Sequence, residues 1–405
     1  MLKLIDSYKE LENEHKDYYG KWTFDKPIFI TEKTTVDMKF VQNALNRCIR
    51  YFVANIDDYI HIMPISNNVR EVLRRTEIKP YETGTYRTDF IITEDNQIKL
   101  IEITCRFALN GFIRSGFVDV WGDIYAQNND ISHTNLYYSF FEDLEKYFEN
   151  YDTIYMLKDD SYNEGRYIKQ LFDVAGKNLI VLTLDEIPAN AEKIRNSACI
   201  SQLTHEELLS LPIDVIDALI DSRLLNDLRT VFLAHDKRFF AVMNNDEFRQ
   251  KALGDVDSER FKSFLTPTYT RLYNPELWNS IRNDKDNWII KPRSYGRSVG
   301  IATGSIISQK EWEVALDALS NEDAVFQPYL KQRLLNGNVG EEVRTNNYVA
   351  GTLLFFQDKF FGMGMFRASN HPITNFGDDR KLAPCHLTGN NTLSADIAGE
   401  DVWIL

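Results

Sequence analysis

The chain has 405 residues, of which 43% are hydrophobic and 13% aromatic, so it can build more than one packed module and wholesale disorder is excluded. Its 60 acidic and 46 basic residues give a net charge of −14, which argues against a nucleic-acid partner because such partners require a clustered basic face. The four cysteines are widely spaced and are predicted to be reduced thiols. The N-terminus does not resemble a secretory signal, so we expect a cytoplasmic protein. No run of about eighteen apolar residues occurs, so no membrane span is expected.

The first part of the chain is predicted to pass from helices to a β-hairpin. Residues 1–80 read as an N-terminal helical segment, because apolar residues within 36–53 recur at three- and four-residue steps. Residues 85–105 read as a hairpin with a turn at 94–97, since β-rich stretches flank a polar tetrapeptide. An amphipathic helix is expected over residues 135–148.

A strand–helix–strand pattern follows within residues 151–225. The expected strands cover 153–157 and 178–184, and the helix between them covers 164–175 and stops at Gly176. This spacing predicts a parallel crossover unit. For residues 199–201 and 218–220 the pattern leaves strands and short helices open.

The last part, residues 226–405, is predicted to be rich in antiparallel strands. The expected elements are a helical region at 225–240, a strand–turn–strand at 285–305, a helix at 308–319, a short strand at 324–330, a strand pair at 343–356 and 360–366, and a turn-rich tail after Arg367. The predicted fold class is therefore α+β: antiparallel sheets flanked by helices, with an inserted α/β crossover module.

Two carboxylates lie on the predicted strands of the early hairpin. Arg87 and Asp89 are two residues apart, as are Glu102 and Thr104, so each pair shares one face of its strand. Pairing of the strands could bring all four around one cation and one phosphate, because Mg²⁺ prefers carboxylate oxygens. The alternative is a surface ladder of opposite charges. Glu102 favours a site, because a glutamate inside an apolar run needs a partner.

A lysine and a glycine-bearing loop follow an apolar strand late in the chain. Lys291 ends this strand and precedes a proline, so its side chain has a defined direction and can reach phosphate oxygens as a point charge. The loop of residues 294–300 can bring backbone N–H groups close to phosphates. Its candidate contacts are Ser294, Gly296, Arg297 and Ser298. The alternative is an ordinary hairpin with a basic edge, because short glycine motifs often match by chance.

Four further residues complete the set of candidates. Lys237 could be a second cation that contacts phosphate or base, or it could belong to a solvated helix face. Gln327 and Tyr329 lie on a short apolar strand that could present groups to an adenine edge or could be core. Arg367 follows alternating small and large apolar residues and could stabilise a transferring phosphoryl group. The seven histidines show no metal-ligand spacing.

Together these segments resemble the ATP-grasp enzymes. The order, with Arg-x-Asp and Glu-x-Thr early and Lys-Pro and Gly-Arg late, is similar to the circularly permuted branch typified by glutathionylspermidine synthase. The counterparts in this chain are Arg87, Asp89, Glu102, Thr104, Lys291, Pro292, Gly296 and Arg297, with Gln327 and Arg367 at the nucleotide hinge and at a late phosphate-binding arginine. The resemblance makes residues 81–150 the metal-ligand half, 151–225 a pre-ATP-grasp-like module and 226–405 the nucleotide-binding half.

The resemblance implies an ATP-dependent carboxylate–amine ligase that uses ATP and Mg²⁺. A substrate carboxylate would attack the γ-phosphate, giving an acyl phosphate and ADP, and an amine would then attack the acyl carbon and release phosphate. The implied partners are a small-molecule carboxylate and a small-molecule amine, of unspecified identity. The oligomeric state is open.

The resemblance also assigns roles to the candidates. Asp89 and Glu102 would hold magnesium, and Arg87 and Arg367 would contact the γ-phosphate or the acyl phosphate. Lys291 and Lys237 would contact the α- and β-phosphates, under a lid formed by residues 294–300.

One position departs from the pattern of this branch. Thr104 stands where the branch carries asparagine, so the binding of a second metal ion stays open; Asn110 could supply an amide instead.

Two alternative functions remain open from the sequence. One is a small-molecule kinase built on the same nucleotide site, and the other is a nucleotide-binding protein without turnover.

Overall fold

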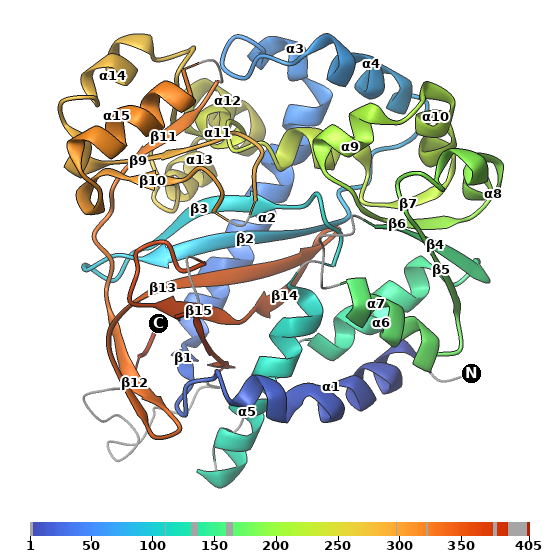
Figure 1. Cartoon of the computed structure of the whole chain (residues 1–405), viewed down its shortest axis with the longest axis horizontal. Coiled ribbons are helices and arrows are strands. Elements are labelled where there is room, and N and C mark those ends of the chain that lie inside the picture. The colour runs from blue at the N-terminus through green and yellow to red at the C-terminus, as the bar shows by residue number, and fades with distance from the viewer. Residues whose placement is uncertain are drawn as a thin grey trace.

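The described part of the chain forms three larger β-sheets and one two-stranded sheet (Figure 1). Two of the larger sheets line the cavity described below. This computed structural model describes residues 3–109, 111–129, 131, 137–158, 165–296, 298–320, 323–375, 379–387 and 403–405. The mixture of helices with antiparallel and parallel sheets is the α+β architecture predicted from the sequence pattern.

The central sheet is antiparallel and has the strand order β16-β15-β13-β2-β3, with β12 and β14 also pairing with β13. Its strands are β2 (Thr85–Ile92), β3 (Ile98–Thr104), β12 (Leu335–Val339), β13 (Glu342–Phe356), β14 (Lys359–Met363), β15 (Phe366–Ser369) and β16 (Lys381–Ala383). The long strand β13 contacts the early hairpin on one side and the C-terminal strands on the other, so it joins segments that lie far apart in sequence.

The two faces of β2 have different surroundings, because successive side chains alternate across a strand. Tyr86 and Phe90 point into an apolar core with helix α2 (Glu32–Ala54), whose first turn is capped by the Thr31 hydroxyl. Arg87 and Asp89 point to the opposite face. The other N-terminal helices are α1 (Leu4–Gly20), α3 (Ile56–Tyr59) and α4 (Asn67–Thr76).

Two helices cover one end of the face that carries Arg87. They are α5 (Phe112–Asn128), which the sequence pattern did not predict, and α6 (Tyr137–Tyr147). Their aromatic side chains pack with α1 and with Leu354, which lies opposite Arg87 on β13. The second sheet lies opposite the remainder of this face.

The second sheet is smaller and antiparallel, with the order β10-β9-β11-β8. Its strands are β8 (Tyr269–Thr270), β9 (Trp288–Lys291), β10 (Ala302–Thr303) and β11 (Val325–Pro328). Its outer face packs around the buried Trp312 of α15 and Trp278 of α14. The surrounding helices are α11 (Phe239–Asn244), α12 (Asp246–Leu253), α13 (Asp255–Lys262), α14 (Pro275–Ser280) and α15 (Gln309–Ala318).

The third sheet is parallel, with the order β5-β4-β6-β7. Its strands are β4 (Thr153–Lys158), β5 (Asn178–Leu182), β6 (Ala198–Gln202) and β7 (Arg223–Leu225), and its helices are α7 (Gly165–Val174), α8 (Ala191–Arg195), α9 (His205–Ser210) and α10 (Ile213–Asp221). The parallel pairing of β4 with β5 confirms the predicted crossover. The two stretches left open resolve into a strand, β6, and a helix, α10.

Two expectations need correction. The region 225–240 is only partly helical: it begins at the end of β7, continues through a π-helical turn (Thr230–Ala234) and then enters α11. The tail after Arg367 is not merely turn-rich, because it supplies β16 and β17 (Cys385–Leu387), and β17 pairs in parallel with β1 (Ile28–Ile30). Both misreadings concern short apolar segments, whose state depends on what they pack against.

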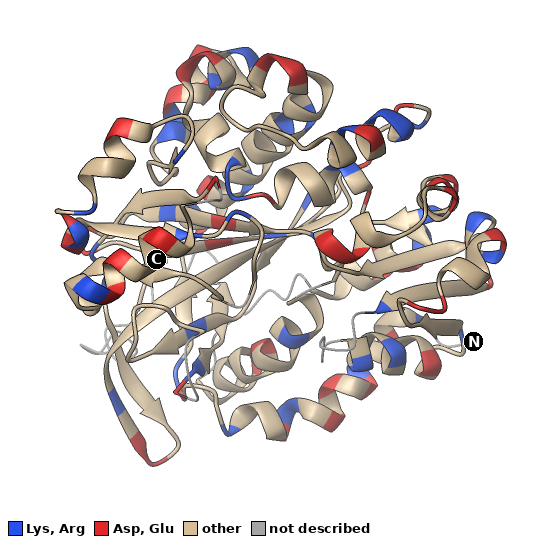
Figure 2. Ribbon diagram, turned by 45° about the horizontal axis from the view of Figure 1, so that its top comes forward, with Lys and Arg blue, Asp and Glu red and all other residues tan. Residues whose placement is uncertain are grey.

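The charged residues and cysteines agree with a folded, reduced chain. In Figure 2, basic and acidic residues alternate along the outer helices. All four cysteines are buried free thiols, as predicted. Within the described ranges, no helix is long and apolar enough to cross a membrane.

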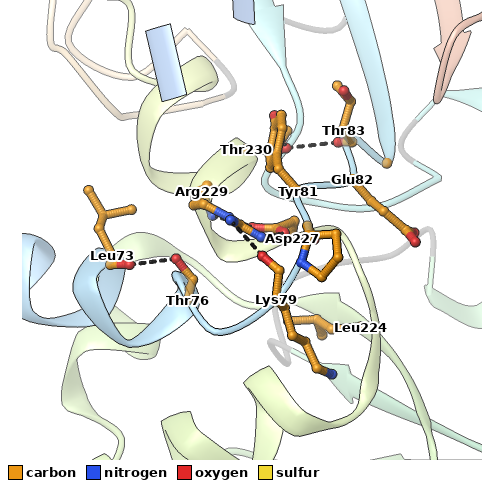
Figure 3. A network of polar contacts seen from close by, with 12 residues as sticks. Leu73, Thr76, Lys79, Tyr81, Glu82, Thr83, Leu224, Asp227, Arg229 and Thr230 are labelled. Atoms are coloured by element: carbon orange, nitrogen blue, oxygen red, sulfur yellow. Dashed lines mark hydrogen bonds and ion pairs between the residues drawn. The ribbon is translucent and has the colours of Figure 1, made fainter. Parts of the chain in front are cut away.

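A polar network fastens the parallel sheet to the segment that leads into β2 (Figure 3). Arg229 forms an ion pair with Asp227 at 2.7 Å and donates hydrogen bonds to the carbonyl oxygens of Lys79 and Pro80. The Thr230 hydroxyl donates to the Thr83 carbonyl at 2.8 Å. These bonds position the start of β2, and hence Arg87 and Asp89.

Asn226 joins the same regions from inside. Its amide nitrogen donates to the carbonyl oxygens of Thr85 and Cys105, at 2.7 and 2.6 Å, and its amide oxygen accepts from the Thr85 backbone N–H at 2.6 Å. The side chain is fully buried, so no water can replace it. One amide therefore ties both strands of the hairpin to the end of β7.

We expect Asn226→Ala to lower the free energy of unfolding by about 3 kcal/mol, because it leaves buried backbone groups of Thr85 and Cys105 without partners. Urea denaturation measures the change. The matched control is Asn178→Ala at an exposed position of β5, where the change should stay within about 0.5 kcal/mol. Equal effects of the two substitutions would contradict the assigned role of Asn226.

Candidate functional site

The early hairpin brings its four predicted residues to one face. In the register of β2 and β3, Arg87 lies opposite Thr104 and Asp89 lies opposite Glu102. Directly opposed residues of an antiparallel pair share a face, so all four side chains point the same way. Asp89 is 5% exposed, which rules out the alternative of a solvent-exposed charge ladder.

A β-bulge interrupts the hairpin beside these charges. The register shifts after Asp89, so that Phe90 pairs with Leu100 and Ile101 is the additional residue on β3. Bulges redirect side chains and leave a backbone group unpaired. Here Lys291 Nζ, from the second sheet, donates to the Ile101 carbonyl oxygen at 3.3 Å. The lysine strand and the acidic hairpin therefore meet across the space between the sheets.

Asp89 is held by arginines from two strands. Arg87 Nε donates to Oδ1 at 2.8 Å, and Arg367 Nη2 donates to Oδ2 at 2.6 Å. Arg367 reaches this point because it pairs with Ala350 on β13, on the same face of the sheet. Burial alone would raise the pKa of Asp89, but the charges of Arg367 and Arg87 outweigh burial and hold the pKa below its usual value.

Glu102 has the partner that its apolar surroundings required. Lys237 Nζ lies 3.1 Å from Glu102 Oε1, and the lysine side chain is 3% exposed. The alternative that Lys237 belongs to a solvated helix face is therefore wrong. Arg238, its neighbour, pairs instead with Asp236 and Asp323 in a separate buried cluster.

The loop after β9 is held down by the same group of cations. Lys237 Nζ also donates to the Tyr295 carbonyl oxygen at 2.7 Å. Arg106, at the end of the hairpin, donates to the Ser294 carbonyl oxygen at 3.4 Å. The backbone of Gly296 lies close to the Arg106 guanidinium: a Cβ atom at this position would be 3.2 Å from it. The loop thus covers the charged residues through backbone contacts.

Between the two sheets lies a cavity of about 100 Å³. On the side of the central sheet it is lined by Asp89, Ile91, Ile101, Glu102, Ala350 and Arg367, and on the side of the second sheet by Ile289, Lys291, Ile301, Thr303 and Gln327. The register of the second sheet explains this set, because Ile289 lies opposite both Thr303 and Gln327 and therefore shares their face. One end of the cavity is charged and the other is largely apolar.

Two connections close the apolar end. Residues 264–266 bond to the edge of β3 at Leu100 before the chain enters β8. Residues 328–333 leave β11 and bond to the end of β2, where Gln332 bridges Thr93 and the Arg333 N–H donates to the Ile92 carbonyl. These two segments, called the hinge below, connect the two sheets, whereas the loop of residues 292–301 lies at the charged end.

Several buried polar atoms around this cavity make no hydrogen bond within the described part of the chain. They are Thr266 Oγ1, Thr303 Oγ1, Gln332 Oε1 and Arg367 Nε. Buried polar groups are nearly always paired, so a cluster of exceptions calls for an explanation. A bound polar ligand in the cavity would supply the missing partners.

Lys291 is the titratable group most affected by the cleft. Burial lowers the pKa of Lys291 to about 8, although the carboxylate of Glu102 partly opposes this, and the charge of Lys237 adds to the lowering. The ammonium group is therefore held charged at neutral pH against a desolvation cost. A cation in that position is available to an anion that enters the cleft.

The predicted site residues divide into three groups. Those that line the cavity are Asp89, Glu102, Lys291, Ser298, Gln327, Tyr329 and Arg367. Those that do not line it are Arg87, Thr104, Lys237, Ser294 and Gly296, of which Arg87 and Lys237 contact lining residues. Arg297 and Asn110 lie outside the described residues. The segments predicted to meet do meet, around Asp89, Glu102 and Lys291.

Several residues of the site were missed in the sequence, among them three with buried polar side chains and one arginine. Thr266, Thr303 and Gln332 line the cavity, and Arg106 contacts the loop. The threonines carry no local signal, because their roles come from the pairing of distant strands. Arg106 follows the hairpin directly, and a cation at the end of an apolar strand was a usable signal.

No group of three or more Asp, Glu, His or Cys residues that could hold a metal ion occurs in the described ranges. The oxygen donors that gather here are Asp89, Glu102 and the hydroxyl of Thr104, on one face of the hairpin. A donor set of this kind cannot enclose an ion by itself.

Two sequence comparisons find similarity to AnkG proteins. A family model described as the AnkG N-terminal domain matches residues 39–233. A curated protein named ATP-grasp enzyme ankG, from Aspergillus thermomutatus, is 24% identical over 190 residues, which cover 42% of this chain and 39% of the relative. The match thus spans well under half of that relative's length.

A solved structure extends the comparison to nearly the whole chain. A glutathione synthetase-like effector from Globodera pallida, in its apo form, has a TM-score of 0.53 and 10% sequence identity, covering 94% of this chain and 96% of that chain. At this identity the likeness shows a shared fold.

Replacing Asp89 tests the charge network directly. We expect Asp89→Asn to lower the free energy of unfolding at pH 7 by about 3 kcal/mol, because the buried charges of Arg87 and Arg367 lose their counter-ion. A carboxyl with a depressed pKa adds stability that is complete above its unfolded-state pKa near 3.8 and is lost as the pH falls through the lower folded-state pKa. Urea titrations at several pH values should therefore show the difference shrinking below that point.

The control for this substitution is Asp57→Asn, at an exposed ion pair with Arg70. Its effect should stay within about 0.5 kcal/mol at every pH. An Asp89→Asn protein as stable as the wild type at pH 7 would show that Arg87 and Arg367 do not need this carboxylate as their counter-ion.

Proposed function

We propose, from its similarity to a curated ATP-grasp enzyme and to a glutathione synthetase-like effector, that the chain is an ATP-dependent ligase that joins a carboxylate to an amine. The cleft between the central and second sheets binds the nucleotide. The carboxylate attacks the γ-phosphate, forming an acyl phosphate with release of ADP, and the amine then attacks the acyl carbon with release of phosphate.

The observation that carries this proposal is the contact between Lys291 and the bulge of the acidic hairpin. Lys291 comes from β9 and Ile101 from β3, almost two hundred residues away, and their 3.3 Å contact brings a phosphate-binding cation beside two carboxylates. A nucleoside triphosphate with its metal ion requires this combination of charges. The unpartnered polar atoms along the cavity support the same interpretation.

The residues fit a magnesium ion whose coordination shell is completed by phosphate oxygens. Asp89, Glu102 and Thr104 supply oxygens on one face, and Mg²⁺ in nucleotide sites takes one or two carboxylates together with phosphates and waters. The ion, when bound, would neutralise charge on the transferred phosphoryl group.

An exchange of ionic partners explains how this site accepts a triphosphate. In the structure, Asp89 is neutralised by Arg87 and Arg367, and Glu102 by Lys237. Phosphate oxygens entering the cleft compete for these cations, so carboxylate oxygens become available for the metal ion. The cations and carboxylates that a triphosphate and its metal ion need are therefore already gathered in one place.

The loop of residues 292–301 would act as the lid. The cavity of about 100 Å³ is smaller than the roughly 300 Å³ of typical ligand pockets, so the loop must move outward to admit a nucleotide. Its contacts with Lys237 and Arg106 use backbone oxygens and can re-form over bound phosphates. Closure would exclude water and protect the acyl phosphate from hydrolysis.

The reaction class can be tested by its products. We expect the protein, given ATP, Mg²⁺ and a pool of carboxylates and amines, to form a condensed amide together with ADP and phosphate, as detected by mass spectrometry. With an ¹⁸O-labelled carboxylate, one labelled oxygen should appear in the phosphate. A stable phosphoester without free phosphate would instead identify a kinase, and AMP as the product would exclude acyl phosphate chemistry.

Glu102→Gln should reduce turnover at least about 100-fold, because it removes a charge that the transition state needs. The matched control is Glu94→Gln in the exposed turn of the same hairpin, which should keep wild-type activity. If Glu102→Gln remained fully active, the proposed metal site would be wrong.

The pKa of Lys291 predicts how nucleotide affinity changes with pH. Because the ammonium form attracts phosphates and is lost as the pH rises through about 8, affinity for a β,γ-imido analogue of ATP should be constant near pH 7 and fall by up to about tenfold per unit above pH 8. Calorimetry in buffers of different ionisation enthalpy should also detect proton uptake on binding at pH 8.5.

Lys291→Gln should bind the analogue about tenfold more weakly at pH 7 and should lose this pH dependence. The control, Lys310→Gln at an exposed position of α15, should behave as the wild type. Persistence of the inflection in Lys291→Gln would show that another group titrates.

A further inference from the structure

The apolar end of the cleft contains an oriented amide. Gln327 lines the cavity from β11, at the point where the chain enters the hinge, and its side chain is buried. Lys291 and the carboxylates occupy the other end, so phosphates would lie there and the base of a nucleotide would lie beside Gln327. Ile91, Ile289 and Leu330 supply apolar walls around it.

A relay of hydrogen bonds determines which way this amide points. Gln327 Nε2 donates to Thr268 Oγ1 at 2.8 Å, and Thr268 Oγ1 donates to the Thr266 carbonyl oxygen at 2.9 Å. Thr268 is 4% exposed and Gln327 is 2% exposed, so water does not substitute for either bond. The hydroxyl proton is used on the Thr266 carbonyl, and the hydroxyl oxygen can therefore only accept from Gln327.

The consequence concerns the other atom of the amide. With its nitrogen engaged by Thr268, Gln327 presents Oε1 to the cavity, and this oxygen accepts no hydrogen bond from any residue that the structure describes. A second buried acceptor without a partner, Gln332 Oε1, lines the same cavity from the hinge. This end of the cleft therefore offers acceptors to whatever occupies it.

We propose that Thr268 is a specificity-positioning residue: by holding the amide nitrogen of Gln327, it makes the base subsite select an amino group, as in adenine, and reject a carbonyl oxygen, as in guanine. An amino group donates to Gln327 Oε1, whereas a carbonyl would face an acceptor and leave both oxygens buried without partners. Thr268 does not itself contact the base. The inference rests on the proposed function only in taking the cleft to hold a nucleoside triphosphate.

The test compares two nucleotides in each variant. Affinities of the full-length protein for the β,γ-imido analogues of ATP and GTP, with Mg²⁺, are measured by calorimetry. In the wild type the adenine analogue should bind at least about tenfold more tightly. Thr268→Val, which keeps the shape and removes the hydroxyl, should reduce this ratio at least about fivefold, because the amide is then free to turn. Thr268→Ser, which restores the hydroxyl, should return the ratio to within about twofold of the wild type.

Two further variants keep the test decisive. Gln327→Met removes the acceptor without altering Thr268, and it should also reduce the ratio, so the inference can be tested even if Thr268→Val does not fold. Thr88→Val, at a fully buried threonine on the face of β2 that points away from the cleft, is the matched control and should leave the ratio unchanged.

The outcomes distinguish the role of Thr268 from the nucleotide site itself. A wild-type ratio in both Thr268→Val and Gln327→Met, with binding retained, overturns the role of Thr268 and leaves the ligase proposal intact. Failure of the wild type to bind either analogue overturns the nucleotide site itself. A loss of affinity for both nucleotides by the same factor in Thr268→Val indicates a merely structural role and also overturns the inference.

Discussion

The pairing of Asp89 with two arginines is the constraint on which the site depends. Arg87 reaches the carboxylate along its own strand, while Arg367 reaches it from β15, across the intervening strand β13 and 278 residues further along the chain. The charges of Arg87, Asp89 and Arg367 are largely buried, and buried charges are tolerated only if each has its counter-ion and the geometry is well defined. The central sheet must therefore keep one register over all of these strands, and an error of one residue would turn Asp89 into the apolar core around α2.

The remaining charges extend from this point to the second sheet. Glu102 lies opposite Asp89 and pairs with Lys237, and Lys237 in turn holds the loop at Tyr295. The bulge at Ile101 exposes the carbonyl oxygen that receives Lys291. Electrostatic contacts thus link the sheets at the charged end of the cleft, while hydrogen-bonded backbone segments link them at the hinge. A molecule bound between the sheets would contact a lysine at one end and an oriented amide at the other.

The division of the cleft into a charged end and an apolar end also separates the tasks of its residues. In the proposed function, most of the groups that meet phosphate and metal lie on strands and therefore have defined directions, while Lys237 and Arg106 contact the backbone of the loop of residues 292–301. Thr268 and Gln327, next to the hinge, form uncharged contacts whose direction is set by hydrogen bonds.

Much of this could be read from the sequence, because the signals were local. The β-rich stretches around the polar turn at 94–97 predict the hairpin, and the two-residue period of a strand places Arg87 with Asp89 and Glu102 with Thr104 on one face. The strand before Pro292 gives Lys291 its direction. The parallel crossover of β4 and β5 follows from spacing in the same way. What the tertiary structure alone decided is which cation meets which carboxylate, where the bulge falls, and that Thr266, Thr303 and Gln332 converge on the cavity. These features arise from pairing between strands far apart in the chain, and the free energy of such pairing depends on burial and register, which no local pattern of residues records.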